Sequence, residues 1–142
     1  MKIKNIQLTS VEARKYLDQD ERPKKVRIDH NSTVSQIKSL DDSVAKIYFQ
    51  YTASYGPLGV IKLEGSLIYE NDDAKKISGD WKDTRKMPNE IASKIHTAVM
   101  HACVPQAVGI AKDLRLPPPI PLPQVRLGSN PKKGQTSGPE VA

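Results

Sequence analysis

The stretch AKIYFQYTASYGPLGVIKLEGSLIY, residues 45–69, decides the fold. On both sides of its central GPLG segment, odd-numbered positions carry apolar residues or glycine, and most even-numbered positions are polar. Because successive side chains of a strand point to opposite faces, this alternation predicts two strands that each turn one face to a core. Pro57 fixes its own φ, and the glycines on either side of it permit positive φ, which favours a turn. The stretch therefore predicts an antiparallel hairpin.

Toward the N-terminus, two further strands are expected. Residues 2–11 alternate loosely, with Ile6 and Leu8 on one face, and residues 26–37 again place apolar side chains two apart. The charged segment 12–25, which ends near Pro23, is expected to be a loop or a frayed extension. The chain thus supplies four strands before any helix.

Toward the C-terminus, residues 70–86 are polar and are expected to form a loop. This loop carries the single tryptophan, Trp81, which is expected to fold back over the core, with a surface contact as the alternative. Pro88 suits the first turn of a helix, and an apolar stripe with helical spacing follows it. Pro105 interrupts this stripe, so a second helix or a kinked continuation is expected after it.

The segment PPPIPLP, residues 117–123, has five prolines in seven positions and is expected to adopt a polyproline II conformation. It is interpreted as a strap packed on the domain's own sheet, with docking to a partner protein as the alternative. Strands followed by helices indicate an α+β fold, here a four-stranded antiparallel sheet with two C-terminal helices on one face. We expect one domain over residues 1–126 and a disordered basic tail over residues 127–142.

The net charge of +6 is concentrated at the two ends of the chain. Basic ends attract nucleic acid or anionic protein surfaces, and a solvated surface is the alternative. With one cysteine, no signal-peptide pattern and no long apolar run, a cytoplasmic protein without a membrane span is expected. The candidate nucleic-acid contacts are Lys24, Lys25, Arg27, Lys132 and Lys133.

No catalytic, cofactor-binding or metal site is predicted, and we expect a protein that is not an enzyme. His96 and His101 are five positions apart on the predicted helix, so they do not share a face. Cys103 lies beside the apolar stripe and is interpreted as a small core residue. The chain contains no glycine-rich phosphate-binding motif.

The polar face of the hairpin still carries a few apolar side chains, which could line a groove or a subunit interface. Burial under the N-terminal strand or a loop is the alternative. The candidate groove residues for a polypeptide are Val44, Tyr48, Val60, Ile68 and Trp81.

Three segments together resemble the SecB export chaperones and their smaller SecB-like relatives. They are YFQYTASYGPLGVIKLEGSLIY, MPNEIASKI and LRLPPPIPLPQV, and the likeness extends over residues 2–125. The resemblance implies a homo-oligomer, a dimer or tetramer, that holds unfolded or nascent polypeptides in apolar grooves without ATP. SecB proteins that deliver cargo to the SecA motor are acidic, whereas this chain is basic and its tail does not match theirs.

The expected function is therefore that of an ATP-independent holdase. The alternative is a basic RNA-binding or ribosome-associated protein built on the same fold. A third hypothesis is an adaptor whose proline run docks a partner.

Overall fold

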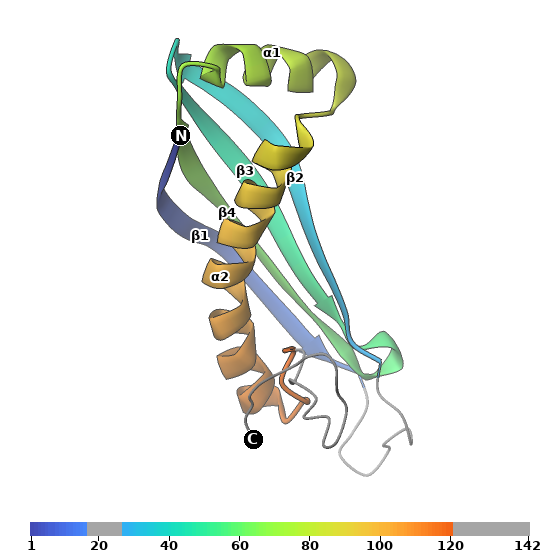
Figure 1. Cartoon of the computed structure of the whole chain (residues 1–142). Coiled ribbons are helices and arrows are strands. Elements are labelled where there is room, and N and C mark those ends of the chain that lie inside the picture. The colour runs from blue at the N-terminus through green and yellow to red at the C-terminus, as the bar shows by residue number, and fades with distance from the viewer. Residues whose placement is uncertain (17–26, 121–142) are drawn as a thin grey trace, which may run out of the picture.

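The fold is a four-stranded antiparallel sheet with two helices on one face, as the sequence predicts (Figure 1). A computed structural model describes residues 1–16 and 27–120. The strands lie in the order β1-β4-β3-β2, so β1 and β2 form the edges. Their bounds are Lys2–Lys15 for β1, Asp29–Asp41 for β2, Val44–Ser54 for β3 and Gly59–Glu70 for β4.

The predicted hairpin is confirmed as β3 and β4. Their register pairs Ile47 with Leu67 and Ala53 with Ile61, which places the odd-numbered side chains of both strands on the buried face. A short 3-10 turn, Gly56–Leu58, joins the strands, and Gly56 has a φ of 61°. The alternation along residues 45–69 thus reports the side chains that form the core.

Strand β1 is longer than expected: residues 12–15, expected to be a loop or a frayed extension, continue the strand. Ala13 pairs with Ile61, Lys15 pairs with Gly59, and the Tyr16 amide donates to the Leu58 carbonyl at 2.8 Å. The whole length of β4 is available as a hydrogen-bonding partner, so the charged residues of β1 remain extended. Strand β2 likewise begins later than expected and runs on to Asp41.

The expected loop over residues 70–86 contains helix α1, Ala74–Thr84, which the sequence reading missed. Ala74, Ile77, Ser78 and Trp81 recur with helical spacing on one side of α1, and the first three are buried. Trp81 is partly buried against the core, which agrees with the expectation that it folds back. In Figure 1, α1 lies across one end of the sheet, and its contacts are with β2 and β3.

Helix α2, Asn89–Leu114, is a single helix that continues through Pro105. Of the two alternatives expected after Pro105, the chain continues the same helix instead of starting a second one there, and the two helices of the fold are α1 and α2. Proline removes the hydrogen bond to the carbonyl four residues earlier, but Pro105 and His101 are both exposed, so water can replace it. The buried stripe of α2 repeats every four residues: Ile95, Val99, Cys103, Ala107 and Ala111.

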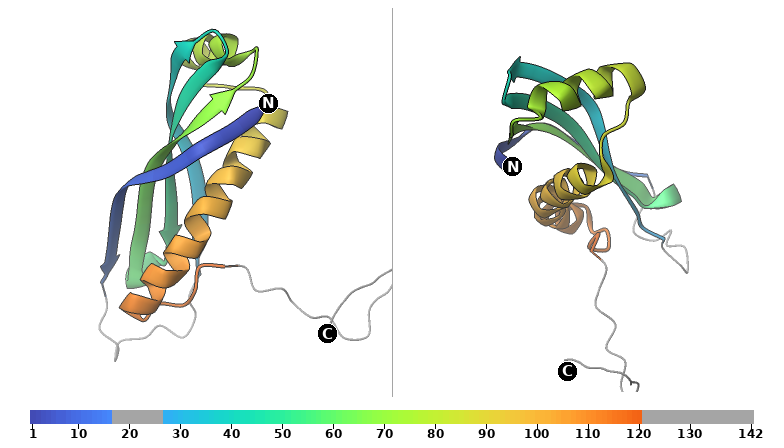
Figure 2. Two further views of the ribbon diagram at one scale, coloured as in Figure 1. Left: turned by 90° about the vertical axis from the view of Figure 1, so that its left-hand side faces the viewer. Right: turned by 45° about the horizontal axis from the view of Figure 1, so that its top comes forward.

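Helix α2 crosses the sheet diagonally and contacts all four strands, and both helices lie on the same side of the sheet (Figures 1 and 2). After α2, Leu116 and Pro119 are buried, so the start of the proline run packs against the domain. Residues 121–142, which hold the rest of the predicted strap and all of the predicted tail, lie outside the described residues. No helix in the described ranges is long and apolar enough to cross a bilayer.

Candidate functional site

The face of the sheet opposite α1 and α2 is not covered by any described element, as the side view in Figure 2 shows. We call it the open face. It is formed by the even-numbered positions of β3 and β4 together with their partners on β1 and β2. These even-numbered side chains are half-buried, apart from Ser66, because their neighbours on the sheet shield them. The open face is therefore the largest sheet surface that the described chain leaves accessible.

Two neighbouring cross-strand rows of side chains on the open face form the candidate site. The antiparallel register aligns partners directly opposite one another, so each row contains one residue from every strand. The first row, in the order β1, β4, β3, β2, is Lys4, Ile68, Lys46 and Lys38. The second row is Gln7, Ser66, Tyr48 and Gln36.

A shallow depression of about 330 Å³ lies where β1 meets these rows. Strand β1 has a register irregularity between Lys4 and Gln7, and Asn5 within it has a φ of 53°. Such bulges bend a strand and re-aim its side chains. Here the bulge places Ile6, which is exposed, beside Ile68 on the open face. The lining residues are Asn5, Ile6, Gln7, Lys46, Ser66 and Ile68.

Two lysines, Lys4 and Lys46, lie on either side of Ile68, one of the two apolar residues that line the depression. The Lys46 ammonium lies 5.3 Å from the centre of the Tyr48 ring, a cation–π contact. The Lys4 ammonium is 3.0 Å from a carboxylate oxygen of Glu70. The depression can therefore hold an apolar side chain while its rim attracts negative charge.

The structure distributes the five predicted groove residues over two faces. Val44, Tyr48 and Ile68 are close together on the open face, since Val44 and Tyr48 flank Lys46, the partner of Ile68. Val60 is on the same face but at the opposite end, beside Arg14 and Ser54. Trp81 belongs to α1, on the other side of the sheet.

Five lining residues were missed by the sequence reading: Asn5, Ile6 and Gln7 on β1, and Lys46 and Ser66 on the hairpin. A bulge depends on pairing with a distant strand, and the only local sign of it is an asparagine inside a strand pattern, a residue type that tolerates positive φ. Nothing in the alternation of residues 2–11 indicates that Ile6 faces away from the helices.

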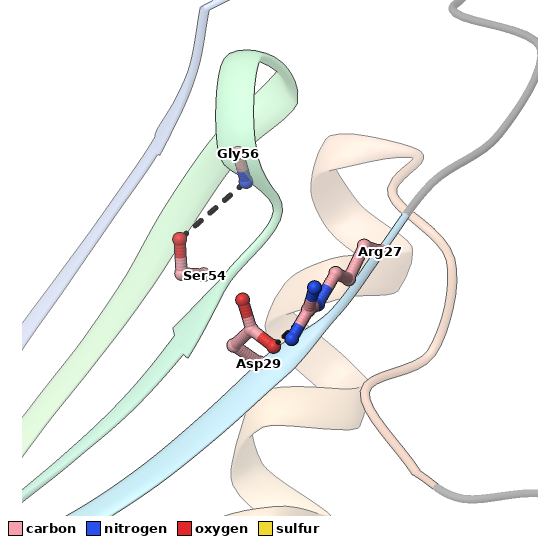
Figure 3. A network of polar contacts seen from close by, with 4 residues as sticks. All are labelled: Arg27, Asp29, Ser54 and Gly56. Atoms are coloured by element: carbon pink, nitrogen blue, oxygen red, sulfur yellow. Dashed lines mark hydrogen bonds and ion pairs between the residues drawn. The ribbon is translucent and has the colours of Figure 1, made fainter.

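Of the predicted nucleic-acid contacts, the structure describes Arg27 alone. Its Nε atom is 3.0 Å from a carboxylate oxygen of Asp29, and both side chains are largely exposed (Figure 3). In the same corner, the Gly56 amide donates to the Ser54 hydroxyl oxygen at 3.4 Å. Asp29 therefore offsets the charge of Arg27. Lys24, Lys25, Lys132 and Lys133 lie outside the described residues.

On the helix side of the sheet, two histidines each form a hydrogen bond with a hydroxyl group. The Ser32 hydroxyl and His96 Nδ1 are 2.7 Å apart, and His30 Nδ1 and the Tyr51 hydroxyl are 2.8 Å apart. Cys103 is buried, and burial raises the pKa of its thiol to about 11, which disfavours the nucleophilic thiolate. Among the described residues, no group of three or more His, Cys, Asp or Glu could hold a metal ion. The two histidine hydrogen bonds thus join β2 to α2 and to β3.

No protein-family model matches the chain, and no curated protein matches it. A solved structure does: the SecB-like chaperone Rv1957 of Mycobacterium tuberculosis, in complex with a ChAD peptide from the Rv1956 HigA1 antitoxin. The TM-score is 0.54 at 13% identity, over 88% of this chain and 87% of that chain. At this identity, the likeness shows that the two proteins share a fold.

Proposed function

We propose that this protein is an ATP-independent polypeptide-binding protein of the holdase type, which takes extended segments of unfolded or nascent chains on its open face. The observation that carries the proposal is the depression in that face, where Ile6 and Ile68 lie side by side in a largely polar sheet surface. The shared fold supports it, because the SecB-like chaperone of that fold was solved with a bound peptide.

The geometry suits weak, sequence-tolerant capture. Burying one aliphatic side chain contributes about 1.5–3 kcal/mol, so a single residue in the depression binds weakly. Val44 and Tyr48 lie next to the depression and extend the apolar contact along β3. A holdase needs this combination, since it must release its clients without an energy source.

We also propose a cytoplasmic homo-oligomer that associates through α2. Residues 95–111 of this helix contain no charged side chain, although Thr97, His101 and Pro105 are exposed. Depletion of charge is typical of the centre of protein–protein interfaces. Sedimentation velocity at several concentrations tests this, and a strict monomer would contradict it.

The alternative of RNA or ribosome binding through the basic ends stays a prediction.

The test of the holdase function is suppression of aggregation. A chemically denatured client enzyme is diluted into buffer without ATP, and light scattering is followed with increasing amounts of this protein. We expect suppression at near-stoichiometric ratios and a clear loss of suppression in the double variant I6T/I68T. The β-branched replacement keeps β-propensity while removing apolar surface.

The matched control is V11T. Val11 lies on β1 and is 56% exposed, but it pairs with Leu63 and therefore points away from the open face. This variant should suppress aggregation as well as the wild type, and far-UV circular dichroism should show that all three proteins are folded. A wild-type protein that leaves client aggregation unchanged would overturn the proposed function.

A further inference from the structure

We propose that the open face selects acidic segments of polypeptide, in which carboxylates flank an aliphatic or aromatic residue. This inference rests on the proposed function and names the class of polypeptide that the same site prefers.

The first cross-strand row carries a lysine on three of its four strands. The row is Lys4, Ile68, Lys46 and Lys38. Strands in a sheet are about 4.8 Å apart, so the row spans roughly 14 Å. Lys46 and Lys38 are direct partners on β3 and β2. Like charges opposite one another destabilise a sheet, and a bound anion would offset that cost.

The positive charges of the three lysines are only partly compensated by carboxylates of the described chain. Lys4 pairs with Glu70 at 3.0 Å, whereas neither Lys46 nor Lys38 forms an ion pair with another residue of the described ranges. The second row, beside them, is uncharged. Glu64 lies beyond that second row. The row on the other side holds Lys2, Glu70 and Asp41, so four lysines and two carboxylates lie within these three rows. The local field over the depression is therefore positive.

Apolar and positively charged side chains alternate along the first row. Ile68 lies between Lys4 and Lys46, with Ile6 beside it, so an apolar anchor in the depression has an ammonium group on each side. In an extended peptide, alternate side chains on one face are about 6.7 Å apart. A segment of the pattern acid–x–apolar–x–acid that runs across the strands matches this order, since long lysine side chains absorb the difference from the strand spacing.

A polypeptide fits these observations better than a nucleic acid. Sequence-tolerant binding of single strands depends on free aromatic faces for base stacking. The one aromatic ring of the two rows, Tyr48, already has the Lys46 ammonium over its face at 5.3 Å.

The experiment uses the full chain and three fluorescein-labelled peptides of equal length with a central phenylalanine. The residues two positions either side of it are Glu in the first peptide, Gln in the second and Lys in the third. Exposed ion pairs contribute about 0.2–1 kcal/mol each, so with two such pairs we expect the Glu peptide to bind about 2- to 30-fold more tightly than the Gln peptide at low salt. This ratio should shrink at 0.5 M salt, because exposed charges are screened.

The variant K38Q/K46Q should bind the Glu peptide no more tightly than the Gln peptide. The matched control is K94Q/K112Q, which removes two positive charges from α2 on the other side of the sheet. It should retain the wild-type preference for the Glu peptide. Circular dichroism should show that both variants are folded.

The results separate this inference from the function on which it rests. If the Gln peptide binds as tightly as the Glu peptide, or if K38Q/K46Q weakens both equally, the preference for acidic segments is wrong and polypeptide binding stands. If none of the three peptides binds, both proposals are wrong. If a single-stranded RNA oligonucleotide displaces the Glu peptide at lower concentration than unlabelled peptide does, the site is a nucleic-acid site and the inference is overturned.

Discussion

The hydroxyl of Tyr55 donates a hydrogen bond to the carbonyl oxygen of Pro117 at 2.6 Å. Tyr55 is the last residue before the turn between β3 and β4 and is 1% exposed, and Pro117 is the first residue of the proline run. The bond joins the turn end of the hairpin to the chain that leaves α2. Leu116 and Pro119 are buried on either side of Pro117, so the beginning of this run packs on its own domain.

Replacing Tyr55 by Phe should therefore detach the start of the proline run. We expect a loss of about 1 kcal/mol in the free energy of unfolding, the usual contribution of one hydrogen bond, measured by urea denaturation. Limited proteolysis should cut faster after residue 114. Y16F removes an exposed phenol and serves as the control, with no change in either measurement. Equal proteolysis of Y55F and wild type would argue that the run is held by other contacts.

Gly65 is required by two close neighbours. A Cβ at this position would lie 2.2 Å from the Gln7 carbonyl oxygen of β1 and 2.8 Å from Cζ of Phe49. We expect G65A to lower the free energy of unfolding by about 1–3 kcal/mol, since overpacking forces the backbone to shift. Hydrogen exchange of β1 amides should accelerate most.

The control for this change is G79A. Gly79 lies in α1 with nothing within 4 Å of its would-be Cβ. Alanine has the higher helix propensity, so G79A should raise stability by about 0.5–1 kcal/mol. A G65A protein as stable as the wild type would mean that β1 is not held close to β4 at this point.

The bond between Ser32 and His96 should stabilise the edge strand β2 against α2. S32A leaves Nδ1 of the half-buried His96 without this partner, at a cost of about 1 kcal/mol in unfolding free energy. S93A alters an exposed serine of the same helix and should stay within about 0.5 kcal/mol of wild type. Equal stability of the two variants would show that the pair contributes nothing to holding β2.

Stability should fall in alkaline solution. Burial raises the pKa of Cys103 from 9.0 to about 11 and that of Tyr55 from 10.0 to about 12. Both groups are neutral in the fold at pH values where they would ionise in the unfolded chain. The stability that these two neutral groups contribute is thus fully present below pH 9. It is lost as the pH rises through about 11 for Cys103 and about 12 for Tyr55.

Unfolding free energies from pH 8 to pH 12 test this expectation. The decline between pH 9 and pH 11 should be shallower in C103A, although that variant is less stable overall because it leaves a small cavity. A stability that is constant from pH 8 to pH 11 would contradict the burial of these groups.

The sequence alone was sufficient for the hairpin and for the fold class. The period-two pattern of residues 45–69 is local, and each odd-numbered side chain of β3 and β4 is buried because strand geometry turns it to the same side. The helical stripe before Pro105 was equally readable, whereas its continuity past Pro105 was not. The candidate groove residues Val44, Tyr48 and Ile68 follow from the same alternation, since whatever is not on the core face must be on the open one.

Tertiary structure decided the rest. Helix α1 has a short, polar sequence, and it forms because Ile77 and Trp81 dock on the sheet end. Residues 12–15 are a strand because β4 supplies their hydrogen bonds, and α2 passes Pro105 because its ring faces solvent. The depression and the lysine row depend on register, which aligns Lys4, Lys46 and Lys38 from three separate parts of the chain. No local pattern encodes such neighbours, because long-range strand pairing alone brings them together.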